Sequence, residues 1–204
     1  MHNKKRIYLL TILFIIGGIL LFLLEYFQLI PKKAYTAENF GIETIQSDID
    51  YNQNGIDDYT DILLGAKKDA KNHPTYKSAY YAGGYPKDDE GVCTDVIWRA
   101  LKEAGYSLKD LMDEDIKNNI EAYSNITIPD PNIDFRRVVN IYTYLERHAL
   151  KLTDDLSKIN EWQPGDIVVF KNHIAIISDK RNKKGIPYII HNAGQPKREE
   201  DTLL

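Results

Sequence analysis

Eighteen consecutive residues, Ile7–Leu24, carry no charge and are mostly apolar. As an α-helix they would reach about 27 Å, which is close to the thickness of the hydrocarbon core of a bilayer. Lys4, Lys5 and Arg6 precede the run, and basic flanks stay on the cytoplasmic side of a membrane. The sequence therefore predicts one transmembrane helix within residues 1–30, with the rest of the chain outside the cytoplasm.

The residues after this run indicate whether the segment stays in the protein as a membrane anchor or is cleaved off as a signal peptide. Glu25 closes the uncharged stretch, and Pro31 prevents a helix from continuing. Signal-peptide cleavage favours a small-x-small pattern, which Lys33-Ala34-Tyr35-Thr36-Ala37 matches poorly. We therefore favour an uncleaved, single-pass anchor in the cell membrane over a cleaved signal, which would leave a secreted protein.

The remainder of the chain has the size of one domain. About 165 residues follow the membrane segment, an ordinary length for a single hydrophobic core. The net charge of −4 argues against a nucleic-acid partner, because such proteins present a basic face. We divide this part into a polar stalk (residues 31–47), an acidic loop rich in Asp, Asn and Gly (48–61) and a folded domain (62–204).

Hydrophobic periodicity predicts helices first and strands later. Apolar residues at helical spacing predict four helices. The first begins at residue 60 or 61 and ends at 71, and the others cover residues 92–104, 107–118 and 134–148. The fourth helix would be capped by Asp134, with Val138, Ile141, Tyr142 and Leu145 as its apolar stripe. Three β-branched and aromatic runs predict short strands, over residues 167–170, 173–178 and 188–191. This order predicts an α+β fold, with N-terminal helices packed on a small antiparallel β-sheet.

The loop between the last two strands predicts their register. Pairing that is symmetric about Asn182 places His173 opposite His191 and Ile177 opposite Pro187. Directly opposed residues point to the same face, with Cβ atoms about 5 Å apart. We therefore expect the two imidazoles to approach hydrogen-bonding distance, although a single bulge would change this register.

Cys93 is the only cysteine of the chain, so it forms no internal disulfide. It stands where a glycine-containing loop becomes a helix, and the positive end of a helix dipole favours a thiolate. Together with His173 and His191 on separate strands, it has the layout of a cysteine nucleophile with a base and an orienting residue. The alternative is a buried structural cysteine.

These features resemble the NlpC-type cell-wall cysteine peptidases, a branch of the papain-like superfamily. The resemblance rests on Tyr80-Tyr81-Ala82-Gly83-Gly84 before the cysteine, on Pro164-Gly165-Asp166, and on the two histidines. More closely, the chain resembles the bacterial family called domain of unknown function 1287, over about residues 55–204. The matching segments are Gly83-Gly84-Tyr85-Pro86, Gly91-Val92-Cys93-Thr94-Asp95-Val96, Pro129-Asp130-Pro131-Asn132-Ile133-Asp134, Arg136-Arg137-Val138, Trp162-Gln163-Pro164-Gly165-Asp166 and Ile190-His191-Asn192.

The resemblance implies a Cys-His-His site that works without a cofactor. Cys93 would attack a carbonyl, His173 would accept and return the proton, and His191 would orient His173. Tyr80 would help to bind the oxyanion, with Tyr81 and Tyr85 as rivals, and Gly84 would line the site. Asn192, on the opposite face of its strand, is the weaker candidate for the third member. The peptidases usually carry Asp-Cys-Ser-Gly at the nucleophile, whereas here Asp95 follows the cysteine and should raise its pKa slightly.

Two arginines could contact a substrate carboxylate, such as those of peptidoglycan stem peptides. Arg136 and Arg137 are adjacent in a predicted helix beside Asp134. Arginine binds carboxylates through a planar fork of N–H groups. The alternative, which we favour, is a solvated face of ion pairs.

The acidic loop has the spacing of an EF-hand-like calcium site. Counting from Asp50, oxygen side chains stand at positions 1, 3, 5, 9 and 12, and Gly55 stands at position 6. The ligands would be Asp50, Asn52, Asn54, the carbonyl of Ile56, Asp58 and Asp61. Asp61 in place of the longer Glu and the charged Asp57 at position 8 depart from the pattern. A calcium ion here would be structural, and the alternative is an Asx-rich turn that leads into a helix.

Together these observations predict a membrane-anchored thiol hydrolase outside the cytoplasm. Its expected substrates are amide bonds in peptidoglycan stem peptides or cross-links. Two alternatives remain: an acyltransferase that passes the same thioester to an amine or alcohol, and a non-catalytic wall-binding or scaffold protein that retains the fold.

Overall fold

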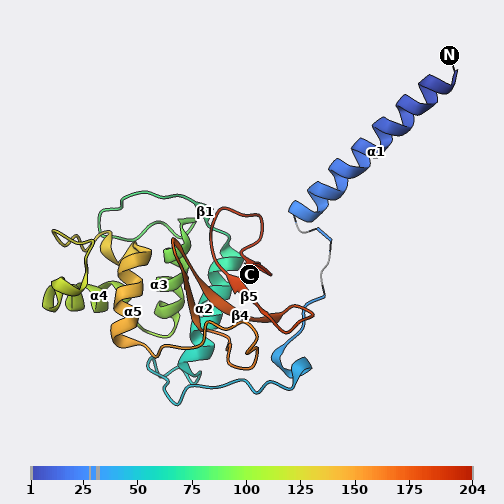
Figure 1. Cartoon of the computed structure of the whole chain (residues 1–204). Coiled ribbons are helices and arrows are strands. Elements are labelled where there is room, and N and C mark those ends of the chain that lie inside the picture. The colour runs from blue at the N-terminus through green and yellow to red at the C-terminus, as the bar shows by residue number, and fades with distance from the viewer. Residues whose placement is uncertain (1, 28, 31–32, 204) are drawn as a thin grey trace. The chain divides into compact units, whose positions relative to one another are not determined.

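The computed structural model describes residues 2–27, 29–30 and 33–203 in two units, residues 1–33 and 34–204. Helix α1, His2–Tyr26, makes up most of the first unit (Figure 1). Its stretch Lys4–Tyr26 is long and apolar enough to cross a membrane, a property that signal sequences and anchors share. Positions 1 and 28 of the predicted membrane segment, positions 31–32 of the predicted stalk and position 204 of the predicted domain lie outside the described residues.

The second unit is an α+β fold, as the order of helices and strands predicts. Its helices among the described residues are α2 (Asp58–Asn72), α3 (Cys93–Glu103), α4 (Leu108–Asn118) and α5 (Val138–His148), with short 3-10 turns η1 (Ala37–Phe40), η2 (Ile120–Ala122) and η3 (Asp134–Arg136). A four-stranded antiparallel sheet has the order β3 (Ile167–Phe170), β4 (His173–Arg181), β5 (Pro187–Ile190) and β6 (Glu199–Glu200). Two short parallel strands, β1 (Thr75–Tyr76) and β2 (Glu90–Gly91), pair separately, just before α3.

Both faces of strand β4 are buried, each in its own core. Ile174 and Ile176 pack in the cluster that contains α3 and Cys93, whereas Ala175 and Ile177 pack in a second cluster. Alternating side chains of a strand point to opposite faces, which explains the division. Strand β4 therefore packs against the helix that begins with Cys93 through Ile174 and Ile176.

Helices α2 and α3 lie side by side (Figure 1) because Gly65 lets their backbones approach. A Cβ atom at Gly65 would lie 2.8 Å from the Cα atom of Ala100 and from the Cβ atom of Glu103. Without that methyl group, the helix surfaces pack at close range. This contact fixes α3, and with it the position of its first residue, against α2.

Several predicted boundaries were wrong by part of a helical turn or more. Helix α2 begins at Asp58, because the Asp57 carboxylate accepts the backbone N–H groups of Tyr59 and Thr60. Asp134 does not cap α5: it begins η3, and α5 follows from Val138. Tyr142 was expected to face inward but is 43% exposed, whereas the neighbouring Tyr144 packs against the core.

The segment predicted as a polar stalk is packed on the domain from Ala34 onward. Tyr35 and Arg181 exchange both of their backbone hydrogen bonds, so the segment adds a bridge beside β4. Ala37 and Ile42 are buried. Small apolar contacts of this kind are hard to recognise in a segment whose composition is mainly polar.

The predicted register of the hairpin was wrong by two residues. Ile177 pairs with Ile189 and Ile176 with Ile190, and an irregularity lies between Ile177 and Arg181. An even shift leaves each side chain on its expected face, because the repeat of a strand is two residues. His191 is therefore displaced along the sheet from the position opposite His173 and stays on the same face.

Candidate active site

Cys93 is the first residue of α3, and its side chain is largely enclosed. The residue is 9% exposed and belongs to the main hydrophobic cluster. Backbone N–H groups of Ile174, Thr94 and Cys93 itself lie within hydrogen-bonding reach of the sulfur and lower its pKa. Burial acts in the opposite direction and dominates, so the pKa of the Cys93 thiol is raised above its ordinary value. The expected preference of a helix N-terminus for thiolate is present but outweighed.

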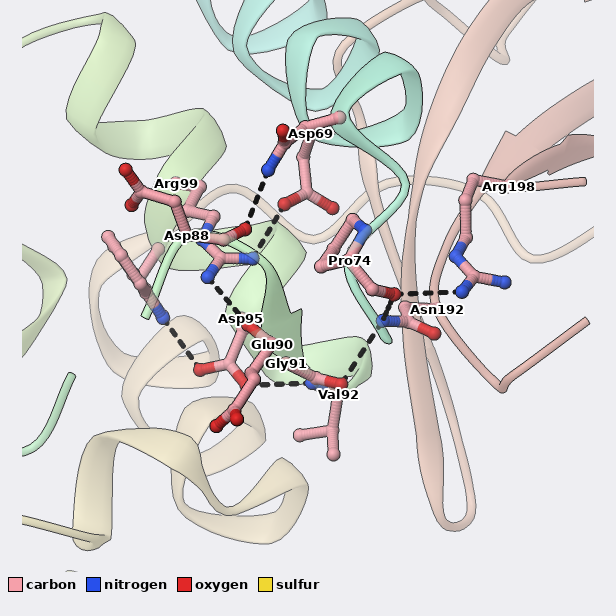
Figure 2. A network of polar contacts seen from close by, with 12 residues as sticks. Asp69, Pro74, Asp88, Glu90, Gly91, Val92, Asp95, Arg99, Asn192 and Arg198 are labelled. Carbon is pink, nitrogen blue, oxygen red and sulfur yellow. Dashed lines mark hydrogen bonds and ion pairs between the residues drawn. The ribbon is translucent and has the colours of Figure 1, made fainter. Parts of the chain in front are cut away.

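A network of polar contacts holds the segment that leads into Cys93 (Figure 2). The Asn192 side chain donates to the carbonyls of Gly91, at 3.1 Å, and Pro74, at 3.2 Å. Arg198 donates to the same Pro74 carbonyl at 2.8 Å. Asn192 thus ties the end of β5 to the corner before α3, and its part in the site stays a prediction.

Arg99 holds the same corner from the helix side. Its guanidinium forms an ion pair of 2.7 Å with Asp69 of α2 and donates to the Glu90 carbonyl at 2.8 Å (Figure 2). The two ion-pair partners are mostly buried. Contacts from α2, α3 and the segment after β5 thus converge on the three residues before Cys93.

Arg136 lies in a buried ion pair, which corrects the expectation of a solvated face. Its Nε and Nη2 atoms contact the two carboxylate oxygens of Asp95 at 2.7 and 2.8 Å. The same carboxylate accepts the Val92 backbone N–H and the Trp98 indole N–H, at 2.7 and 2.8 Å. The guanidinium that was considered for a substrate carboxylate is therefore already bound to an internal one, and Arg137 is the exposed arginine of the pair.

His173 and His191 lie in direct contact. The His173 Nε2 and His191 Nδ1 atoms are 2.7 Å apart, and the rings meet edge-on at 85°. Burial and the charge of His191 lower the pKa of His173 to about 4. His173 is therefore a neutral imidazole near pH 7, which is the form that a general base needs.

Two residues that the sequence did not single out surround the other nitrogen of His191. Its Nε2 atom lies 3.1 Å from Glu200 Oε1 and 3.1 Å from Gln195 Nε2. Both residues follow β5, in a polar segment without a recognisable motif. The one available signal was a glutamate pair, Glu199-Glu200, close enough in sequence to return to the same sheet.

The thiol and the imidazoles adjoin the same end of β4. The sulfur contacts the backbone of Ile174, and His173 is the preceding residue. Within the described part of the chain, no hydrogen bond joins the thiol to either ring. His173 directs its Nε2 atom toward His191, and its role toward the thiol stays a prediction.

The aromatic and glycine segment before Cys93 is anchored beside the first turn of α3. Arg136 donates to the Ala79 carbonyl at 2.9 Å. The exposed Tyr80 hydroxyl accepts from the Asn132 amide at 3.0 Å and donates to Asp130 at 3.4 Å. The structure therefore directs Tyr80 toward the turn at residues 130–132, and its oxyanion role stays a prediction.

Gly84 and Tyr85 have packing contacts. A Cβ atom at Gly84, whose φ is +89°, would lie 2.8 Å from the Phe135 ring. The Tyr85 ring packs on Trp98 and Phe135, with centroid distances of 4.7 and 5.2 Å. These contacts explain both residues without a ligand, and their part in substrate binding stays a prediction.

The predicted calcium loop has its side chains gathered around α2. The amide nitrogens of Asn52 and Asn54 lie 2.8 and 2.9 Å from Asp61 Oδ2. Asp50 accepts the backbone N–H groups of Asn54 and Gly55. Asp58 instead accepts the Tyr51 N–H and the Tyr106 hydroxyl. Asp50, Asn52, Asn54 and Asp61 are thus the side chains that could hold a cation, together with the Ile56 carbonyl.

Comparison with known proteins places the folded domain in a family. The chain is 37% identical over 139 residues to the protein "Uncharacterized protein YijF" of Escherichia coli (strain K12), covering 64% of this chain and 67% of that relative. No solved structure matches the chain. The family described as Domain of unknown function (DUF1287) matches residues 63–204, a span that includes Cys93, His173, His191 and Glu200. The chain therefore belongs to the DUF1287 family.

Proposed function

We propose that this protein is an extracytoplasmic thiol hydrolase that cleaves amide bonds in peptidoglycan stem peptides or cross-links. The observation that carries the proposal is the contact of 2.7 Å between His173 and His191, on the strand whose next backbone N–H, that of Ile174, contacts the Cys93 sulfur. Cys93 at a helix start, His173 on the packed strand and His191 directly after the next strand would supply the nucleophile, the base and the orienting residue of a papain-like site.

The substrate class rests on the resemblance to NlpC-type cell-wall peptidases and on the apolar helix α1, which supports export. We infer that α1 is retained as an anchor, which would hold the domain at the outer face of the membrane, within reach of the wall. A cleaved signal would release the same domain. The substrate is thus inferred by analogy with that family, whereas the reaction is argued from the residues of the site.

In the proposed reaction, Cys93 starts as a neutral thiol. Burial raises the pKa of the thiol and lowers that of His173, so both partners are uncharged before substrate binds. As sulfur attacks the carbonyl carbon, the thiol proton moves to His173 Nδ1. The C–N bond then breaks, and His173 returns the proton to the departing amine, which leaves a thioester on Cys93.

Water completes the cycle. It attacks the thioester carbonyl while His173 Nδ1 takes its proton, and the C–S bond breaks to release the carboxylic acid and restore the thiol. The Cys93 backbone N–H lies in the first turn of α3, where no intrahelical carbonyl accepts it. It is the donor that we assign to the oxyanion.

The test uses the full chain in detergent, incubated with purified peptidoglycan sacculi and analysed by mass spectrometry. We expect soluble muropeptides whose new termini differ from the parent by one water across an amide bond. Cys93→Ala and His173→Ala should each abolish their release, while Lys171→Ala, an exposed change near β4, should leave it intact. Sacculi that stay intact with the wild-type chain would contradict hydrolysis.

The same experiment separates the alternatives. An acyltransferase would yield new conjugates when an amine acceptor is added, with products that still depend on Cys93. A non-catalytic wall-binding protein would sediment with sacculi equally well as wild type and as Cys93→Ala. The buried thiol with its raised pKa is the observation that favours this second alternative.

A further inference from the structure

Glu200 is an acidic residue in direct contact with His191 of the proposed catalytic pair. It lies on β6, and its Oε1 atom is 3.1 Å from His191 Nε2. The His191 and Glu200 side chains are only 9% and 12% exposed. A carboxylate with little access to water interacts more strongly with its neighbours than one at the surface.

The neighbouring Glu199 has other partners. Its carboxylate contacts the Ser178 hydroxyl and the Lys180 ammonium, each at 2.5 Å. Successive side chains of a strand point to opposite faces, so the two glutamates serve different sides of the sheet. Glu199 therefore provides a matched control for the charge at Glu200.

The tautomer of His191 decides whether His173 can act as a base. A neutral imidazole has one N–H and one lone pair. If His191 carries its proton on Nε2, its Nδ1 lone pair accepts the His173 Nε2–H, and His173 Nδ1 is free to take the thiol proton. If His191 carries its proton on Nδ1, His173 must be protonated on Nδ1 and cannot accept that proton.

Glu200 and Gln195 favour opposite tautomers. An ionised Glu200 carboxylate is only an acceptor, so it calls for a proton on His191 Nε2. The Gln195 amide nitrogen, also 3.1 Å away, would donate to an unprotonated Nε2. Gln195 already donates to the His191 carbonyl at 3.1 Å, and its amide oxygen accepts the Ala193 N–H at 2.7 Å. A charge-assisted hydrogen bond is about twice as strong as a neutral one, so the carboxylate prevails.

We infer that Glu200 is a positioning residue that sets the tautomer of His191 and thereby makes His173 Nδ1 the base for Cys93. The inference rests on the proposed function, because it assigns Glu200 a role in that same site. The contacts run from Glu200 to His191 and from His191 to His173, and the step from His173 to the thiol is the proposed proton transfer. Glu200 acts through His191 and does not touch the substrate.

The test measures alkylation of the single cysteine by iodoacetamide as a function of pH, with the full chain in detergent and without substrate. Glu200→Gln removes the charge and keeps the size. We expect the apparent pKa of the thiol to rise by about one unit, which corresponds to about tenfold slower alkylation near neutral pH. Glu199→Gln should leave the profile unchanged, and Glu200→Asp should recover part of the rate.

Two further measurements establish the route. In a His191→Ala background, Glu200→Gln should have no additional effect on the alkylation profile. Because the chain has five histidines, spectra of ¹⁵N-histidine-labelled protein can follow each ring. We expect His191 to be protonated on Nε2 in the wild type and to lose that preference in Glu200→Gln. Circular dichroism verifies that the variants are folded, and the spectra decide the tautomer even where alkylation is slow.

Equal profiles for Glu200→Gln and Glu199→Gln, or a Glu200 effect that persists without His191, would overturn the inference. Its failure is distinct from failure of the proposed function. If sacculi stay intact while the alkylation profile of the thiol depends on Glu200, the peptidoglycan substrate is wrong and the positioning role of Glu200 stands. If the Glu200→Gln variant still releases muropeptides at the wild-type rate, the positioning role of Glu200 is wrong and the proposed hydrolase activity stands.

Discussion

The Asp95–Arg136 ion pair joins the first turn of α3 to η3. The two side chains are 0% and 2% exposed, and their contacts use both carboxylate oxygens. Taking charges out of water is costly, so such a pair is held by its geometry and by its additional hydrogen bonds. Removing one partner leaves the other charge buried and alone. The pair therefore makes the start of α3, where Cys93 lies, sensitive to a single change.

We predict that Arg136→Met lowers the free energy of unfolding by about 3–5 kcal/mol, because the Asp95 carboxylate would remain buried without its cation. Denaturant unfolding measures this loss. Arg137→Met, which changes the exposed neighbour, should lie within about 0.5 kcal/mol of wild type. Adding Asp95→Asn to Arg136→Met should recover part of the loss. Equal effects of the two arginine substitutions would contradict the buried pair.

Candidate residues could be selected from the sequence where chemistry limits the choice, and not where burial decides which side chain turns inward. Cys93, His173 and His191 were selected because thiols and imidazoles are few in this chain, and the two rings do meet. Arg136 and Arg137 are identical in type and adjacent, so their order in the chain does not reveal which of the two turns inward. Glu200 has no motif, and its relevance depends on a strand of two residues that brings it beside His191.

At the scale of elements, the acidic loop controls how α2 begins. Asp57 caps the helix, and Asp61, in its first turn, receives the amides of Asn52 and Asn54. Turning each of these amides by 180° would replace nitrogen by oxygen at the same place. The loop would then offer amide and carboxylate oxygens to a cation, which are ligands that Ca²⁺ prefers.

We predict that calcium binds this loop and raises the melting temperature of the full chain in detergent, with EGTA reversing the rise. Extracellular calcium modules have dissociation constants of about 0.1–1 mM, so the titration should extend into the millimolar range. Asp50→Asn should weaken the response, while Asp48→Asn, an exposed change outside the ligand positions, should preserve it. An identical melting temperature with calcium and with EGTA would leave the loop as an Asx-rich turn.

The helices and strands themselves were largely predictable, whereas the residues at which they end and the register of the strand pairs were not. Helices α3 and α4 and strands β3 to β5 follow the predicted apolar runs, because burial of one face imposes a period on the sequence. The hairpin register slipped by two residues, since a symmetric loop was assumed and an irregularity lies between Ile177 and Arg181. A backbone irregularity does not change the alternation of apolar and polar residues. The predicted faces of β4 and β5 were therefore right, whereas their predicted residue pairs were wrong.

At the scale of the whole molecule, two partly buried groups respond to acid in opposite directions. Burial and His191 lower the pKa of His173 from 6.5 to about 4, so between these values the unfolded chain binds more protons. His173 therefore contributes stability above pH 6.5 that is lost as the pH falls toward 4. Burial raises the pKa of Asp166 from 3.8 to about 6. Its contribution is fully present below pH 3.8 and is lost as the pH rises through 6.

We predict that the contributions of His173 and Asp166 to the pH dependence of stability partly cancel in the wild-type chain. Substituting either residue should reveal the contribution of the other. Asp166→Asn should stabilise the domain relative to wild type by an amount that grows from pH 4 to pH 6, because it removes a partly buried carboxylate that ionises in this range. His173→Gln should become more stable relative to wild type as the pH falls from 6.5 to 4, because it removes the base that the unfolded chain protonates first. Urea unfolding at several pH values measures both differences, with the exposed Asp154→Asn as a control that should show neither trend. Parallel stability curves for wild type and His173→Gln would contradict a lowered pKa of His173 in the folded chain.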